Sequence, residues 1–381
     1  MNCAPTASMP DCCDPVALAQ ALIRFASVTP EDHGCQAALA DWCITLGGRV
    51  EWMPFGNITN LVVRFGAAEN PRFCLAGHTD VVPVGRPESW TVAPFGGEVI
   101  GGFLYGRGAV DMKGAIAAMV AAIAREKRGG GDPEVILVIT GDEEGDSVDG
   151  TDKMLHALAA RGALPEQAVV GEPTNPTKLG QTIKNGRRGT VNGTITILGM
   201  QGHAAYPAQA DNPIHRGLPA LHELASLKLD DGYPGFSPTS IQITNLNAGV
   251  GASNVIPGRM SAVVDIRYSP AINFAGIETA ICQVLERHNL RYELELVHHG
   301  VAFATPPGPL VEKVRQAVVR HTGMEPELST SGGTSDARFF KVYGVEVVEF
   351  GLVGQSMHRA DERTAVDDLE RLTEIYRALL R

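Results

Sequence analysis

The sequence predicts an α/β protein, in which a mixed, mostly parallel sheet flanked by helices carries an inserted α+β domain. Three observations predict this fold class. Strand-like and helix-like segments alternate over the first half of the chain, which is typical of βαβ units. Segment 134–140 (EVILVIT) is rich in β-branched residues, as a buried parallel strand is. The strands after residue 188 alternate like half-exposed ones, and the first pattern resumes at 309.

The first elements follow from helix-start and strand signals. Asp14 and Pro15 predict the start of a helix, because a capping residue followed by proline is preferred there. A second helix is expected at 34–46, ending at the glycine pair 47–48. The next segments are assigned by their β-branched or alanine-rich composition: strands at 60–65, 72–76, 134–140 and 168–170, and helices at 113–127 and 151–160.

The inserted domain is expected at 189–300, where the elements follow a β-α-β-β-α-β-like, ferredoxin-like order. Its strands are predicted at 190–198, 240–245 and 260–267, and its helices at 212–226 and 272–288. A helix from 309, a strand at 345–350 and a helix at 366–380 follow. We therefore expect one discontinuous domain, 1–188 with 301–381, around the insertion.

Composition excludes several classes of protein. The 381 residues include 32 Lys and Arg and 43 Asp and Glu, a formal charge of −11, which argues against general nucleic-acid binding. The longest apolar run, 115–124, is about half of the roughly 20 residues that a membrane-spanning helix needs. The first fifteen residues lack the basic and apolar parts of a secretory signal, so we expect a cytoplasmic protein without a membrane partner. The seven cysteines form no CxxC pair and are expected to be reduced thiols.

Five motifs with acidic or histidine side chains follow predicted strands. They are GHTD (77–80), GRGAVDMKG (106–114), TGDEEG (140–145), GEPT (171–174) and MHRADE (357–362). Each alone has an ordinary explanation, such as a structural histidine, a solvated loop end or a turn. Together they predict one site, because ligands of open α/β sheets bind beyond the carboxyl ends of the strands.

The residue types in these motifs fit a pair of metal ions. Zinc accepts histidine nitrogen and carboxylate oxygen, and two ions with three ligands each and one shared carboxylate need five side chains. The five candidate ligands are His78, Asp111, Glu144, Glu172 and His358, with Asp111 as the natural bridge. Asp80 is expected to accept the spare ring N–H of His78. Glu143, beside a ligand but free itself, is a candidate general base.

The run of motifs from GHTDVVPVG to GEPT resembles the co-catalytic zinc aminoacylase and carboxypeptidase superfamily. The resemblance covers the chain from about residue 14 to 381. Three further segments are similar to the desuccinylases of that superfamily: IKNGRRGT (183–190), GMQGHAAYP (199–207) and SGGTSDARF (331–339). The superfamily implies a zinc-binding catalytic domain and a lid or dimerisation domain at 189–300, and hence a homodimer.

The resemblance also implies roles for single residues. His78 and Glu172 would complete one zinc site, Glu144 and His358 the other, and Glu143 would serve as both base and acid. The peptide bond between Asp111 and Met112 would be cis. Zinc is expected, and cobalt also fits these nitrogen and oxygen ligands at one or both sites.

The substrate residues follow from the same resemblance. Arg187 and Arg188 would bind a carboxylate, for which arginine is suited. His203 would enter the active site of the other subunit and stabilise the oxyanion. The remaining expected contacts to the substrate are Asn254, Arg267, Gly332 and Thr334.

The reaction implied is hydrolysis of N-succinyl-LL-2,6-diaminoheptanedioate to succinate and LL-2,6-diaminoheptanedioate, in the synthesis of lysine and peptidoglycan precursors. The alternatives are an acetylornithine deacetylase or another N-acyl-amino-acid amidohydrolase, a broad dipeptidase, and a non-enzymatic homologue. The arginine pair favours the first reaction, since a succinyl group carries a second carboxylate and an acetyl group does not. The occupied ligand and base positions argue against a protein without activity.

Overall fold

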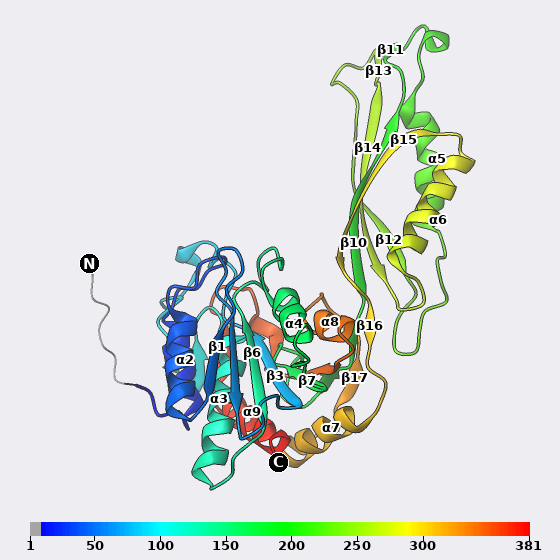
Figure 1. The fold of residues 1–381 in the computed structure, drawn as a ribbon. Helices are drawn as coiled ribbons and strands as arrows, with labels where there is room; N and C mark the ends of the chain where they lie inside the picture. The colour runs from blue at the N-terminus through cyan, green and yellow to red at the C-terminus, as the bar shows by residue number, and fades with distance from the viewer. Residues whose placement is uncertain (1–8) are drawn as a thin grey trace. The chain divides into compact units, whose positions relative to one another are not determined.

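The computed structural model describes residues 9–381, which divide between two units (Figure 1). The first unit holds the residues up to 185, together with 305–329 and 335–381. The second holds 186–304 and the short stretch 330–334. The sequence predicts residues 330–334 in the catalytic domain, but they belong to the second unit. The reason is that the chain returns to the second unit after β17 (Glu327–Ser329).

A mixed sheet in the order β1-β2-β6-β3-β7-β18-β8-β17 forms the centre of the first unit. Its other strands are β1 (Arg49–Trp52), β2 (Leu61–Phe65), β3 (Phe73–His78), β6 (Val135–Thr140), β7 (Gln167–Val170), β8 (Thr182–Lys184) and β18 (Glu346–Glu349). β3 is parallel to both β6 and β7, and β18 is parallel to β7, whereas β2 is antiparallel to β6. The predicted fold class is confirmed.

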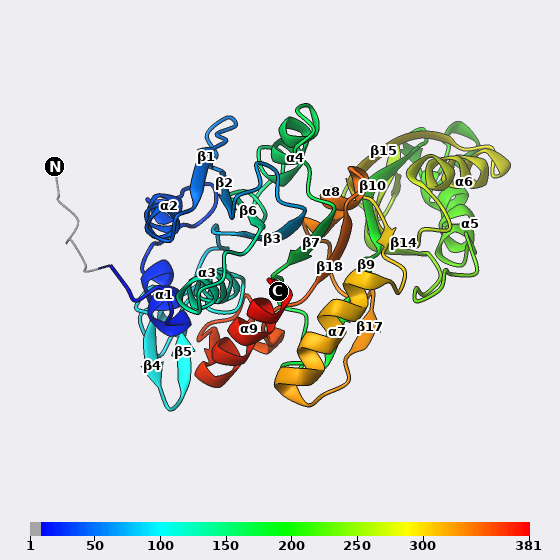
Figure 2. The same cartoon turned by 60° about the horizontal axis from the view of Figure 1, so that its bottom comes forward.

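Helices cover both faces of this sheet (Figure 2). One face carries α1 (Pro15–Ile23), α2 (Cys35–Thr45), α3 (Lys113–Arg128), α7 (Pro309–Thr322) and α9 (Val366–Leu379), whose apolar residues share one core. The other face carries α4 (Thr151–Ala159) and α8 (Ala337–Val342). The alanine-rich, fully buried part of α3 allows α1 and α9 to pack closely against it.

Local signals explain several boundaries. The Asp14 carboxylate accepts hydrogen bonds from the backbone N–H groups of Val16 and Ala17, so α1 begins where the sequence predicts. A small sheet of β4 (Glu98–Ile100), β5 (Phe103–Tyr105) and β19 (Arg363–Ala365) was not predicted, and neither were β1, β8, β17 and α8. These elements are short, so their sequences carry little periodicity.

The second unit contains an antiparallel sheet in the order β12-β14-β10-β15. The strands are β10 (Gly189–Leu198), β12 (Ser240–Ala248), β14 (Arg259–Tyr268) and β15 (Arg291–Gly300), and the helices are α5 (Pro213–Ala225) and α6 (Phe274–Arg287). Alternate residues of β14 are buried and share a core with both helices. The chain order is the predicted β-α-β-β-α-β, with β15 as the strand that the sequence pattern did not reveal.

Short strands complete the second unit: β9 (Gly186–Arg187) pairs with β16 (Phe303–Ala304), and β11 (Gly202–His203) pairs with β13 (Val255–Ile256). Among residues 9–381, no helix has both the length and the apolar character needed to cross a membrane.

Candidate metal centre

Neighbouring parallel strands of the first unit end at the candidate site. His78 is the last residue of β3, and β3 lies between β6 and β7 in the sheet. Glu143 and Glu144 follow the end of β6, and Glu172 follows the end of β7. Because the carboxyl ends of these strands lie at one edge of the sheet, their side chains converge as predicted.

Asp111 is at the centre of the cluster. Its Oδ1 lies 3.2 Å from Nε2 of His78, and its Oδ2 lies 3.2 Å from Nε2 of His358. Glu144 Oε1 is 2.9 Å from Nε2 of His358, and Glu172 Oε1 is 3.7 Å from Nε2 of His78. The five predicted ligands therefore form two groups that share Asp111. The peptide bond from Asp111 to Met112 is cis, as the resemblance implies.

The donor set fits divalent cations. Oε1 of Glu172 is buried and has no hydrogen-bond partner, although it points toward a histidine nitrogen. A bound cation would satisfy that oxygen. Two overlapping sets of ligand atoms lie close enough together to hold an ion: His78 with Asp111 and Glu144, and His78 with Glu143 and Glu172. Distance alone thus leaves Glu143 available as a ligand as well as a base.

Burial and mutual repulsion dominate the electrostatics of the metal-free site. Burial raises the pKa of Glu143 and of Glu172 well above the ordinary value, and neighbouring carboxylates add to the shift. Hydrogen bonds that His358 donates to Asp111 and Glu144 raise its pKa to about 10. Burial also raises the pKa of Asp111, but hydrogen bonds from His358 and His78 outweigh it and hold that pKa below its ordinary value. The site stabilises positive charge, which is the electrostatic requirement of a metal site.

Asp80 contacts His78 differently from the prediction. Nδ1 of His78 lies 2.9 Å from the backbone oxygen of Asp80, whereas the carboxylate is 3.6 Å away, so the expected carboxylate acceptor is wrong. A carbonyl oxygen only accepts, so Nδ1 carries a proton, and Nε2 faces Asp111, where it would bind a metal ion after losing its own proton. The Asp80 carboxylate instead accepts hydrogen bonds from the backbone N–H groups of Glu143, at 3.2 Å, and Glu144, at 2.9 Å.

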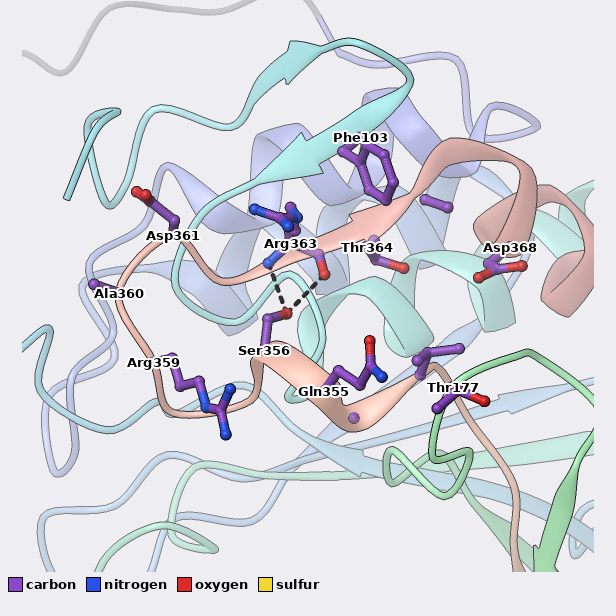
Figure 3. A pocket seen from close by; sticks show the side chains of 13 residues that line it. Phe103, Thr177, Gln355, Ser356, Arg359, Ala360, Asp361, Arg363, Thr364 and Asp368 are labelled. Carbon is purple, nitrogen blue, oxygen red and sulfur yellow. Dashed lines mark hydrogen bonds between the residues drawn. The ribbon is translucent and has the colours of Figure 1, made fainter.

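The loop that carries His358 is closed by its own side chains (Figure 3). Ser356 Oγ accepts a hydrogen bond from the backbone N–H of Arg363 and donates one to the carbonyl oxygen of the same residue. Asp361 accepts hydrogen bonds from the backbone N–H and the hydroxyl of Thr91. His358 and Asp361 have φ angles of 61° and 54°, in the left-handed region, where these residue types are tolerated. The loop geometry thus places the His358 side chain.

A cavity of about 930 Å³ lies against this loop (Figure 3). Its lining includes Thr177, Gln355, Arg359 and Asp368, but none of the predicted site residues. The cavity is therefore separate from the candidate metal centre.

Two charged residues near Asp111 were not singled out from the sequence. Arg107 lies in the GRGAVDMKG motif and Glu362 in MHRADE, and their side chains are 2% and 0% exposed. Their presence inside two of the five motifs was the only available signal, because burial of an ion pair depends on the tertiary structure.

The predicted substrate residues lie in the second unit, where two of them meet. Arg187 is buried and donates from Nη1 to the carbonyl oxygen of Ser331 at 3.2 Å. A side chain at Gly332 would place its Cβ 2.5 Å from the same Nη1, so the glycine allows this approach. Arg188 is partly exposed, and so is Thr334.

The other substrate candidates have varied surroundings. His203 and Asn254 are exposed neighbours, since the backbone N–H of Ala204 donates to the Asn254 carbonyl at 2.9 Å. Arg267 is engaged on two sides, by the Asp265 carboxylate at 2.8 Å and by the Thr190 hydroxyl at 3.0 Å.

Comparison with known proteins decides the family. The model of peptidase family M20/M25/M40 matches residues 74–381. The chain belongs to this family. The M20 assignment confirms the resemblance to the zinc aminoacylase and carboxypeptidase superfamily and the prediction of a metal-dependent hydrolase that acts on amide bonds.

Two relatives of this M20 protein that align over nearly the whole chain share a name. A succinyl-diaminopimelate desuccinylase from Rhodospirillum centenum is 51% identical over 374 residues, covering 96% of each chain. A protein of the same name from Magnetococcus marinus is 48% identical over 371 residues, covering 96% of this chain and 97% of its own.

Solved structures of other peptidases share the fold at low identity. An aminopeptidase from Bacillus cereus matches with a TM-score of 0.78 and 19% identity, covering 98% of this chain and 99% of its own. A dinuclear metal-binding M20 peptidase from Bacillus subtilis matches with a TM-score of 0.70 and 15% identity, covering 96% and 95%.

Proposed function

We propose that this M20 protein hydrolyses N-succinyl-LL-2,6-diaminoheptanedioate to succinate and LL-2,6-diaminoheptanedioate. The observation that supports amide hydrolysis most directly is Asp111, which has a histidine on each carboxylate oxygen. The substrate is proposed from the relatives named as desuccinylases, whose identity of about half extends over nearly the whole of both chains. The reaction would serve lysine and peptidoglycan precursor synthesis in the cytoplasm.

The proposed cofactor is a pair of zinc ions, for which cobalt could substitute. His78 and Glu172 would hold one ion, His358 and Glu144 the other, and Asp111 both. When bound, the ions supply Lewis-acid polarisation of the carbonyl and acidify water. The orphaned oxygen of Glu172 and the mixture of nitrogen and oxygen donors support this assignment.

Glu143 is proposed as the group that moves the proton. Its carboxylate would accept a proton from the attacking water and return it to the nitrogen of the leaving amine. A carboxylate suits both steps, since the proton that it accepts from water is the one that it can then donate to the amine. Asp80 would hold Glu143 and Glu144 in place through their backbone N–H groups.

The second unit is proposed to bind the substrate and to form a homodimer. Arg187, Arg188, Gly332 and Thr334 would bind the succinyl carboxylate. Asn254 and Arg267 would bind the diaminoheptanedioate part, and Arg267 would do so while paired with Asp265. His203 of the partner subunit would donate a hydrogen bond to the amide oxygen as it gains charge.

The decisive measurement is succinate release from the proposed substrate, with and without a chelator. We expect release that stops when metal is removed and returns when zinc is added. Acetylornithine and an unmodified dipeptide provide the comparison, because neither carries a succinyl carboxylate for the arginine pair. Turnover of acetylornithine or the dipeptide at a rate equal to or above that of the succinyl substrate would reject the proposed specificity.

A further inference from the structure

One buried carboxylate joins two of the loops that form the metal centre. Glu362 is fully buried, and its Oε1 accepts hydrogen bonds from three backbone N–H groups. The donors are Gly108 at 3.1 Å, Val110 at 2.9 Å and Asp111 at 3.2 Å. Glu362 thus binds the backbone of a predicted ligand directly, although its own side chain is not among the candidate ligands.

The second oxygen of this carboxylate is occupied by an arginine from the same motif as Asp111. Arg107 Nη1 lies 2.5 Å from Glu362 Oε2, and it also donates to the carbonyl oxygen of Arg359 at 3.3 Å. Its Nη2 donates to the carbonyl oxygen of Pro83, and its guanidinium group stacks 5.2 Å from the Trp90 ring. The ion pair is neutral overall, so it adds no net charge beside the metal centre.

These contacts connect the chain around His358 with the chain around Asp111. The backbone N–H of Gly106 also donates to the carbonyl oxygen of Glu362, at 2.9 Å. The loop that ends at Glu362 therefore cannot shift against the segment 106–111 without breaking several buried hydrogen bonds. Asp111 and His358 are the two ligands on these segments.

We propose that Glu362 is a positioning residue that sets the separation between Asp111 and His358 and thereby the affinity of the metal centre. It acts on Asp111 by fixing its backbone N–H, and on His358 by ending the loop that carries it. Groups that orient metal ligands in this way typically contribute 10–100-fold to affinity or activity. The inference rests on the proposed function, because it assumes that these two residues bind metal.

Three variants of the full-length protein test the proposal. Glu362→Gln replaces two acceptor oxygens by one carbonyl oxygen and one NH₂ group. The carbonyl oxygen can face either Arg107 or the backbone N–H groups, so one of these sets of donors loses its acceptor. Glu362→Asp keeps the charge but is one methylene too short to reach both partners, and it would fold where the first variant failed. Arg359→Lys is the matched control: it lies in the same loop, its side chain is exposed, and the substitution keeps both the positive charge and the backbone carbonyl oxygen that accepts from Arg107.

The primary measurement is the zinc retained by each metal-loaded protein in competition with a chelator. The absorption spectrum of the Co²⁺-loaded form is the second readout, and KM with kcat is the third. We expect both Glu362 variants to bind zinc about 10–100-fold more weakly, with a changed Co²⁺ spectrum and a fall in kcat rather than a rise in KM. The Arg359→Lys protein should match the wild type in each readout.

Two outcomes would overturn the proposal. One is a folded Glu362 variant that retains zinc and gives the Co²⁺ spectrum of the wild type. The other is failure of both variants to fold, which would make Glu362 a requirement of the fold. A wild-type protein that binds no metal would instead reject the proposed function itself, so the two failures are distinguishable.

Discussion

Asp111 receives a histidine on each of its two carboxylate oxygens, with acidic side chains beyond each histidine. Both histidines have raised pKa values in the metal-free site, so protons there balance carboxylates. Divalent cations would replace those protons at the same positions. Protons and metal ions thus compete for one set of ligands at this site.

Glu143 needs its own test, because its distance from His78 and Glu172 permits it to be either a metal ligand or a base. We predict that Glu143→Ala retains two metal ions per chain and loses about 10²–10⁴-fold in turnover, the usual contribution of a general acid–base group. Metal analysis and succinate release measure the two effects separately.

The control for this variant is Asp146→Ala, which removes an exposed carboxylate from the same loop. It should retain both metal and turnover. Loss of metal from Glu143→Ala would identify Glu143 as a ligand, and a turnover close to that of the wild type would remove its role altogether.

At the scale of elements, the chain after β18 lies close to the chain after β7, and Gly351 is the residue at the contact. A Cβ on Gly351 would lie 2.3 Å from the carbonyl oxygen of Gly171 and 2.4 Å from that of Glu172. Both are backbone atoms, so the strand end that carries Glu172 would have to move. A side chain at Gly351 therefore disturbs a candidate ligand from the neighbouring strand.

We predict that Gly351→Ala lowers the free energy of unfolding by about 1–3 kcal/mol, as overpacking does, and also weakens metal binding. Gly354→Ala is the matched control, because its nearest neighbour is Pro173 at 3.7 Å, an ordinary contact. Denaturant unfolding and metal content provide the readouts. Equal stability of the two variants would show that the strand ends can separate without cost.

Elements with strong periodicity could be predicted from the sequence, and the others could not. The run 134–140 predicted β6 to within a residue, because a strand buried on both faces is apolar throughout. β15 (Arg291–Gly300) is an exception, because apolar residues and glutamates alternate over Tyr292–Leu296 as in a half-exposed strand, although no strand was predicted there. Its pairing with β10 is what makes it a strand.

The candidate site shows the same division. The ligand types and their places after strands could be predicted, since strand ends of a parallel sheet share one edge. The acceptor of the His78 ring and the burial of Glu362 could not, because each depends on which backbone groups the fold brings within about 3 Å. Sequence order does not encode those distances.

At the scale of the whole molecule, the candidate metal ligands all lie in the first unit and the proposed substrate residues in the second. Metal retention and substrate binding therefore depend on different parts of the chain. The formal charge of −11 is distributed over the molecule, but the acidic residues of the metal centre are concentrated at one edge of the sheet in the first unit. Their protonation links the pH to the stability of the protein.

In the metal-free protein, the raised pKa values in this cluster give folding a specific pH dependence. Burial raises the pKa of Asp80 from 3.8 to about 6, and those of Glu143 and Glu172 are raised well above 4.5. A group with a raised pKa contributes stability that is complete below its unfolded pKa and is lost as the pH rises through its folded pKa. His358, raised from 6.5 to about 10, follows the same rule at higher pH. The lowered pKa of Asp111 acts oppositely, but only near and below its ordinary value of 3.8.

Between pH 5 and pH 8, the metal-free protein should therefore lose stability from this cluster, while metal binding strengthens because fewer protons occupy the ligands. We predict that the difference in Tm between the zinc-loaded and the chelator-treated protein widens across this range. Thermal unfolding at several pH values in matched buffers measures this difference in Tm. Glu172→Gln removes one of the titrating carboxylates, so it should reduce the pH dependence of Tm in the chelator-treated protein. A Tm difference that stays constant or narrows with rising pH would contradict the view that protons and metal ions compete for these side chains.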